Sequence, residues 1–107
     1  MINQTDLCKS NNHFRVAWRN TLTGEINVFG DYPTYDEAYQ SISDWWKKHD
    51  FTPGYVRVIV DDQHSCFTID YTSHYFFYDI HCSTEPLSDE EIIARSKPFL
   101  PKKFRED

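Results

Sequence analysis

The chain has 107 residues, the length of a single domain, and a formal net charge of -6. An acidic chain has no general basic surface with which to hold a nucleic-acid backbone, so we expect no direct nucleic-acid ligand. Aromatic residues make up 17% of the chain and glycines number only 3, which argues against a disordered tail or a flexible linker.

The start of the chain has no signal-peptide pattern, and no long apolar run predicts a membrane span. The three cysteines are an odd number without disulfide-framework spacing, which favours reduced thiols and a cytoplasmic protein.

The first elements in chain order read as a flexible segment followed by a β-hairpin. Residues 1–12 are polar and have a loop composition, so we expect a flexible N-terminal segment. Phe14, Val16 and Trp18 then alternate with other residues, the period of a strand with one buried face. Residues 25–29 alternate again after a glycine-containing turn, which predicts a hairpin.

The segment 34–49 predicts an amphipathic helix whose apolar residues fall within an arc of roughly 120°. These residues are Tyr35, Ala38, Tyr39, Ile42, Trp45, Trp46 and His49. Thr34 can cap the helix while Glu37 reaches back to the cap amide, and Pro53 with Gly54 ends it. Because a sheet needs this face as cover, the two tryptophans predict scaffold packing and only weakly indicate ligand binding.

The second half of the chain predicts three more strands and a short helix. Residues 55–60, 65–71 and 74–80 have strand patterns, and the last is aromatic on both faces. Its second face is either core beneath another helix or an exposed interface. Ser88 and Glu91 have capping-box spacing, and the basic residues beyond predict an extended strap or a mobile tail.

The predicted order is therefore β-β-α-β-β(-β)-α. It indicates an α+β fold, with an antiparallel sheet of four to five strands and one main amphipathic helix packed on one face, a two-layer sandwich. We expect a single domain at 13–82, a flexible segment at 1–12, and a short helix with a Pro-containing basic tail at 83–107.

No motif names a reaction, and we predict no catalytic residue, metal or cofactor. His81 and Cys82 point to opposite faces of a strand, and no Cys-x-x-Cys or His-x-x-x-His pair exists to hold a metal. Two alternatives to a binding module stay open. One is a small enzyme that uses Cys66 or Cys82 with a histidine, and the other is a structural homodimer.

Charge and aromatic content give the best indication of function. Residues 1–96 hold seven basic and fifteen acidic side chains, a net of -8, whereas the last eleven residues hold four and two, a net of +2. An acidic surface with aromatic anchors favours a protein partner that has a basic surface. The predicted partner-binding residues are Asp36, Glu37, Gln40, Asp44, Asp61, Asp62, Tyr75, Phe76 and Tyr78.

Three segments of the chain resemble small accessory proteins of phages and prophages, including anti-CRISPR proteins. They are 36–39 through Trp45-Trp46, then 68–71, then 73–78, and the resemblance covers roughly 13–81 without a catalytic motif. It implies a non-enzymatic inhibitor in the host cytoplasm that blocks a nucleic-acid-handling defence protein, such as a CRISPR effector nuclease.

Overall fold

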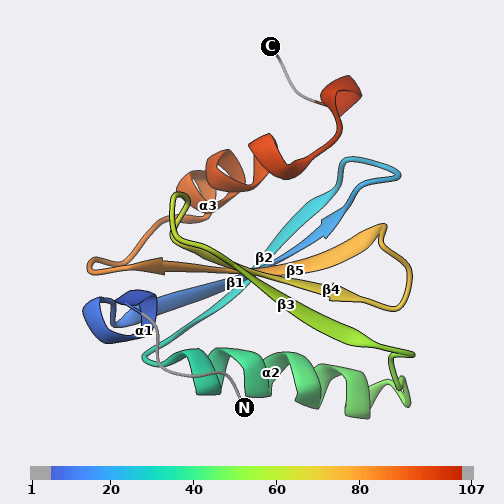
Figure 1. The fold of residues 1–107 in the computed structure, drawn as a ribbon, viewed down its shortest axis with the longest axis horizontal. Helices are drawn as coiled ribbons and strands as arrows, with labels where there is room; N and C mark the ends of the chain where they lie inside the picture. Colours follow the sequence, from blue (N-terminus) through green and yellow to red (C-terminus); the bar gives the residue numbers. More distant parts are fainter. Residues whose placement is uncertain (1–5, 105–107) are drawn as a thin grey trace.

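The computed structural model describes residues 6–104 and shows a five-stranded antiparallel sheet with helices on both faces (Figure 1). The elements are α1 (Asp6–Ser10), β1 (His13–Asn20), β2 (Ile26–Tyr32), α2 (Tyr35–Lys48), β3 (Val56–Asp61), β4 (Cys66–Tyr71), β5 (Phe76–Ser83), α3 (Asp89–Ser96), η1 (Lys97–Phe99) and η2 (Lys102–Phe104). The predicted α+β class is confirmed, with the longest helix packed on one face of the sheet.

The strands lie in the order β2-β1-β5-β4-β3. The β1–β2 hairpin and the three strands β3, β4 and β5 are therefore joined by the pairing of β1 with β5. These central strands pair antiparallel along their whole length, from His13 opposite Ser83 to Asn20 opposite Phe76. The helix α2 connects the two edge strands, β2 and β3, and must therefore cross beneath the entire sheet. This crossing is why one helix can cover most of the face.

The core lies between α2 and the sheet. Thr34 caps the helix by accepting a hydrogen bond from the Glu37 amide, and its hydroxyl lies 3.3 Å from the Glu37 carboxylate. Tyr35, Ala38 and Ile42 are buried with Trp46 against the sheet. Their partners across the interface are Phe14, Val16, Phe67, Ile69, Tyr71, Tyr78, Ile80 and Cys82.

Trp45 departs from the prediction that the whole aromatic face is buried. Its side chain is 47% exposed, whereas Trp46 is 7% exposed. Adjacent helical residues point about 100° apart, so a helix lying on a sheet can direct only one of the two straight at it. Trp45 is left at the margin of the interface.

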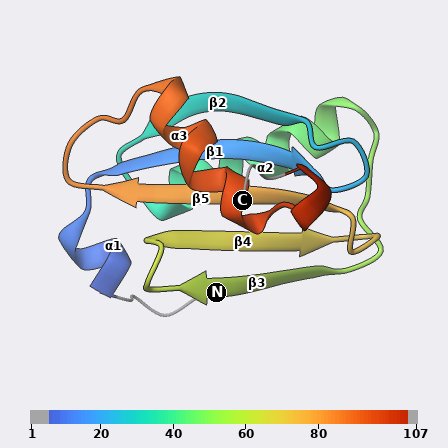
Figure 2. The same cartoon turned by 90° about the horizontal axis from the view of Figure 1, so that it is seen from above.

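The opposite face of the sheet is polar and lies beneath α3 (Figure 2). The Arg19 guanidinium pairs with the Asp79 carboxylate at 2.9 Å, and both side chains are almost fully buried. Thr68 also donates to Asp79, and the Phe99 carbonyl accepts from Arg19. The rings of Phe77 and Phe99 contact the guanidinium. The second face of β5 is thus covered by a satisfied ion pair and the C-terminal segment.

Both ends of the described chain are tied to the domain. In α1, Leu7 is only 7% exposed and joins the core, although residues 1–12 were expected to be flexible, and residues 1–5 lie outside the described part. Ser88 and Glu91 form the predicted capping box. Beyond α3 the basic segment forms the short turns η1 and η2, and Leu100 between them is 4% exposed.

A β-bulge shapes the edge strand β2. Arg15 pairs with Asp31 and Ala17 with Val28, so Val16 lies opposite two residues, Phe29 and Gly30. The Arg15 guanidinium donates to the Phe29 carbonyl at 2.8 Å, which compensates for the interrupted ladder. It also bonds the Leu87 carbonyl and the Asp89 carboxylate, which fixes the start of α3 to the same point.

Candidate functional site

An open cleft lies between the C-terminal half of α2 and the end of the sheet where β1 and β4 finish and β5 begins. Its volume is about 590 Å³, within the range of small-molecule and side-chain pockets. All three tryptophans of the chain line it. The lining residues are Trp18, Asn27, Phe29, Trp45, Trp46, His49, Phe51, Tyr71, Thr72, Phe76 and Tyr78.

The floor of the cleft is a packed set of rings on the sheet. The Trp18 indole donates a hydrogen bond to the Tyr71 hydroxyl at 2.9 Å and stacks on Phe76 with ring centroids 5.8 Å apart. The Trp46 ring centroid lies 5.3 Å from that of Tyr71 and 6.0 Å from that of Tyr78. Interlocked rings with few free rotamers give a preorganised surface.

The rim is more exposed. Trp45 is 47% exposed, Phe29 is 40% exposed and Phe51 is 38% exposed. The Phe29 and Trp45 rings face each other across the cleft margin, with centroids 6.3 Å apart. The His49 ring packs on the Trp45 ring with centroids 4.1 Å apart, and His49 Nδ1 lies 2.9 Å from the Trp45 carbonyl oxygen. The bulge in β2 and the last turn of α2 therefore supply the two opposing aromatic walls.

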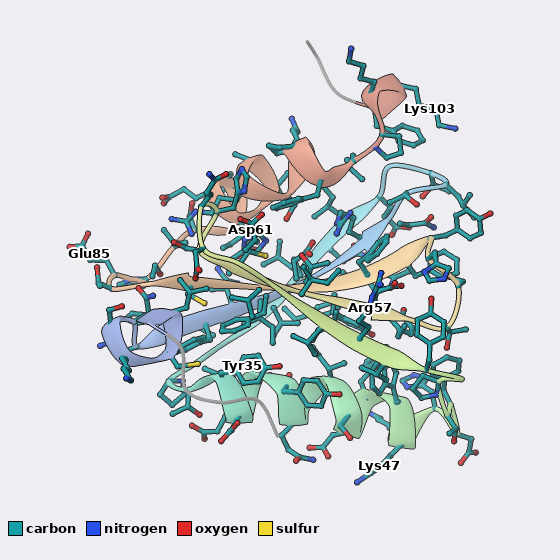
Figure 3. The ribbon with its side chains drawn as sticks, in the orientation of Figure 1. Tyr35, Lys47, Arg57, Asp61, Glu85 and Lys103 are labelled. Atoms are coloured by element: carbon teal, nitrogen blue, oxygen red, sulfur yellow. The ribbon has the colours of Figure 1, made fainter. Side chains whose placement is uncertain are left out.

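None of the residues that line the cleft is acidic, and none is Lys or Arg. Burial raises the pKa of Tyr78 and of Tyr71 above the ordinary range, so both phenols are neutral at pH 7. Lys47 directly follows the cleft residue Trp46 on α2, but its side chain points away from the sheet (Figure 3). The cleft suits an uncharged, flat or apolar group that can stack on rings.

A buried carboxylate supports the β4–β5 turn, which brings Thr72 and Phe76 to the cleft. Asp70 accepts hydrogen bonds from the Tyr55 hydroxyl at 3.1 Å and the Arg57 guanidinium at 3.1 Å, and its Oδ2 lies 2.8 Å from His74 Nδ1. Burial acts to raise the pKa of Asp70, but the hydrogen bonds from His74 and Tyr55 and the nearby positive charges outweigh it and lower the pKa below its ordinary value. Asp70 is thus an ionised anchor on the face opposite the cleft.

The predicted binding residues fall in four separate places. Phe76 and Tyr78 line the cleft, although Tyr78 is only 6% exposed. Tyr75 is 52% exposed just before β5 and does not line it. The polar set on the exposed surface of α2 is Asp36, Glu37, Gln40 and Asp44. Asp61 and Asp62 lie at the β3–β4 turn, far along the sheet from the cleft.

Most cleft residues were outside the predicted set, among them Trp18, Phe29, Trp45 and Phe51. A signal existed for Trp45, because two adjacent tryptophans on one helix cannot both face the same sheet. Phe29 had none, because the bulge that directs it toward α2 depends on pairing with β1.

Two of the three cysteines, Cys66 and Cys82, lie in the interior and away from the cleft. Cys66 is 0% exposed and Cys82 is 1% exposed. Burial raises the pKa of the Cys82 thiol to about 12 and that of Cys66 well above its usual value, so both are protonated at neutral pH. His81, paired with Cys66 across the sheet, is fully buried, and burial lowers its pKa to about 4. An accessible thiolate does not arise from these groups.

Within residues 6–104, no group of three or more His, Cys, Asp or Glu side chains is arranged to hold a metal ion. None of the helices in that range has the length and apolar character needed to cross a membrane. No family model, curated protein or solved structure matches the chain.

Proposed function

We propose that the chain is a non-enzymatic protein-binding module whose aromatic cleft receives an apolar or aromatic side chain of its partner. The observation that supports this is a rim of exposed rings, Phe29, Trp45 and Phe51, around a preorganised aromatic floor. Exposed aromatic residues next to a pocket are typical of interface hot spots. A mostly aromatic lining without Asp, Glu, Lys or Arg favours an apolar anchor over a charged one.

Net charge supports a partner with a basic surface. The chain carries -6 overall, and such a field accelerates encounter with a positive surface without requiring acids at the point of contact. In segment 44–51, which supplies four of the cleft residues, the charges of Lys47 and Lys48 offset those of Asp44 and Asp50. We therefore assign steering to the whole molecule and anchoring to the aromatic rings. The narrower proposal, a phage-type inhibitor of a nucleic-acid-handling defence protein, is supported by this charge and by the resemblance of the 36–46 and 68–78 segments.

The experiment begins by placing a photo-crosslinking phenylalanine analogue at Trp45 and identifying the partner in host cells. The affinity of that purified partner is then measured for the wild type, Trp45→Ala, Phe29→Ala and the matched control Leu22→Ala. Leu22 is 53% exposed but does not line the cleft. We expect the two cleft variants to weaken binding by about 30-fold each, a hot-spot loss, and the control to stay within about twofold.

Two outcomes would overturn the proposal. One is a crosslinked partner that binds Trp45→Ala as tightly as the wild type. The other is an uncharged small aromatic molecule that binds the cleft stoichiometrically while no protein crosslinks, which would make the chain a small-molecule carrier.

A further inference from the structure

The strand β3 is an edge of the sheet (Figure 2). It exposes apolar side chains on both of its faces. Val56 is 40% exposed and Val60 is 37% exposed on the face toward α2, while Ile59 is 42% exposed on the other face. An edge strand with four β-branched residues among its six is a template for another strand, and natural edges are usually protected by proline, bulges or inward charges. The sequence Val-Arg-Val-Ile-Val-Asp holds no proline and pairs with β4 in a continuous register.

One hydrogen bond shows which backbone groups of β3 point away from β4. The Thr72 amide donates to the Tyr55 carbonyl, so these residues form a hydrogen-bonded pair. In an antiparallel ladder such pairs alternate with non-hydrogen-bonded ones. Arg57, Ile59 and Asp61 therefore direct their backbone groups toward β4. The amides and carbonyls of Val56, Val58 and Val60, which alternate with those residues, point outward.

The charges on β3 are arranged for pairing with an identical strand. Arg57 lies two residues before Ile59, and Asp61 lies two residues after it, on the same face (Figure 3). We propose that β3 pairs antiparallel with β3 of a second copy of the chain, centred on Ile59, to form one continuous ten-stranded sheet.

This register satisfies the charges and the backbone together. Each Arg57 lies opposite Asp61 of the other copy, Ile59 lies opposite itself, and Val58 lies opposite Val60. The outward backbone groups of Val58 and Val60 exchange four hydrogen bonds across the two-fold axis. Arg57 and Asp61 become non-hydrogen-bonded pairs, in which side chains approach most closely.

Existing contacts of the two charged residues are compatible with this pairing. Arg57 bonds Asp70 through Nη2, and its side chain is 64% exposed. A guanidinium has five N–H donors, so it can bridge two carboxylates. Asp61 bonds His64 at the β3–β4 turn and keeps its side chain 29% exposed.

A register centred on Val58 would instead place Arg57 opposite Ile59 and leave both charges without opposite partners. Because one short strand pair lies at the low end of interface size, we expect a weak, concentration-dependent dimer.

The test is sedimentation of the full chain over a wide concentration series, with two proline variants. Val60→Pro removes an outward amide without removing a bond to β4, so the monomer should fold and the dimer should be lost. Val56→Pro is the matched control, because its outward amide falls opposite Asp62, beyond the partner strand. Circular dichroism checks that each variant keeps the wild-type spectrum.

Charge variants at Asp61 test the register independently and leave the bond of Arg57 to Asp70 in place. Asp61→Arg should shift the dimer toward monomer, because each Arg57 would then lie opposite a positive side chain of the other copy, whereas Asp61→Glu should retain the dimer, because it keeps the opposite charge. Wild type that stays monomeric at the highest concentration overturns the proposal, as does a dimer that survives in Val60→Pro. Loss of the dimer in Val56→Pro but not in Val60→Pro overturns it too, as would edge pairing seen only with a strand of a different protein.

Discussion

The buried pair of Arg19 and Asp79 is the most consequential interaction at the scale of single residues. Both side chains are at most 5% exposed, and the pair is completed by the Thr68 hydroxyl and the Phe99 carbonyl. Asp79→Ala leaves the guanidinium buried without its counter-ion, which costs about 3–5 kcal/mol in free energy of unfolding. Urea denaturation at pH 7 measures this loss.

The matched control is Asp89→Ala, which breaks the ion pair of Arg15 with a carboxylate that is 64% exposed. Asp89 is the solvent-exposed partner, and Arg15 keeps its bonds to the Leu87 and Phe29 carbonyls, so this variant should lose only about 0–1 kcal/mol. Equal losses in the two variants would contradict the assignment of Arg19 and Asp79 as the main polar contact of the second face.

The buried side chain of His81 should make the free energy of unfolding fall at acidic pH. Its Nε2 lies 3.1 Å from the Ser96 hydroxyl, which itself donates to the Ile92 carbonyl, so Nε2 carries the proton and Nδ1 is the site left to titrate. Nδ1 is buried without a hydrogen-bond partner among the described residues. Burial lowers the pKa of His81 from 6.5 to about 4 in the folded chain. Between these values the unfolded chain binds more protons than the folded one, so stability falls as pH falls.

The full shift corresponds to about 3 kcal/mol, lost progressively between pH 6.5 and pH 4. Urea denaturation in steps across that range, for wild type and His81→Gln, measures the pH slope. The variant should have the flatter slope, even if it is less stable at pH 7. An identical slope in both proteins would assign the acid sensitivity to other groups. Asp70, whose pKa is lowered from 3.8, contributes only at more acidic pH.

At the scale of elements, local patterns predicted what depends on neighbours in sequence. The alternation in β1, the arc of α2 and the Ser88 capping box all depend on residues a few positions apart. The bulge at Phe29 and the cleft depend on pairing between distant strands, which no local period encodes. The helix α1 was missed because it is five residues long and its core contacts come from two adjacent residues, Leu7 and Cys8, so it shows no helical apolar period.

The C-terminal strap is an element whose contribution can be measured. Leu100 is 4% exposed, and Phe104 packs so closely on Gly24 that a Cβ there would lie 2.8 Å from the ring. Leu100→Ala should destabilise the fold by about 2–4 kcal/mol through the lost burial and the cavity left behind. Lys102→Ala, at an exposed position of the same strap, should stay within about 0.5 kcal/mol. Thermal and urea unfolding distinguish an integral strap from a loosely held tail, which would tolerate both changes.

At the scale of the whole molecule, the three tryptophans allow binding in the cleft to be followed by intrinsic fluorescence. Trp18, Trp45 and Trp46 are the only tryptophans in the chain, and all line the cleft. Binding of an anchor there should therefore change the intrinsic fluorescence, and Trp45→Phe should remove part of that change while preserving the fold. A partner that binds tightly without altering the emission would be contacting another surface.

Because we assign steering to the net charge and anchoring to the aromatic rings, we expect the two to affect different rate constants, association and dissociation respectively. Asp36→Asn with Asp44→Asn removes two exposed negative charges from α2 and changes the net charge from -6 to -4 (-6 + 2). Steering depends on the summed field, so the double variant should slow association and weaken its dependence on salt, with little change in dissociation. Trp45→Ala should do the opposite, because losing a desolvated anchor mainly accelerates dissociation. Surface plasmon resonance at several ionic strengths resolves the two rates. If the acid variant changes dissociation as much as Trp45→Ala does, then Asp36 and Asp44 contact the partner directly and the interface extends from the cleft along α2.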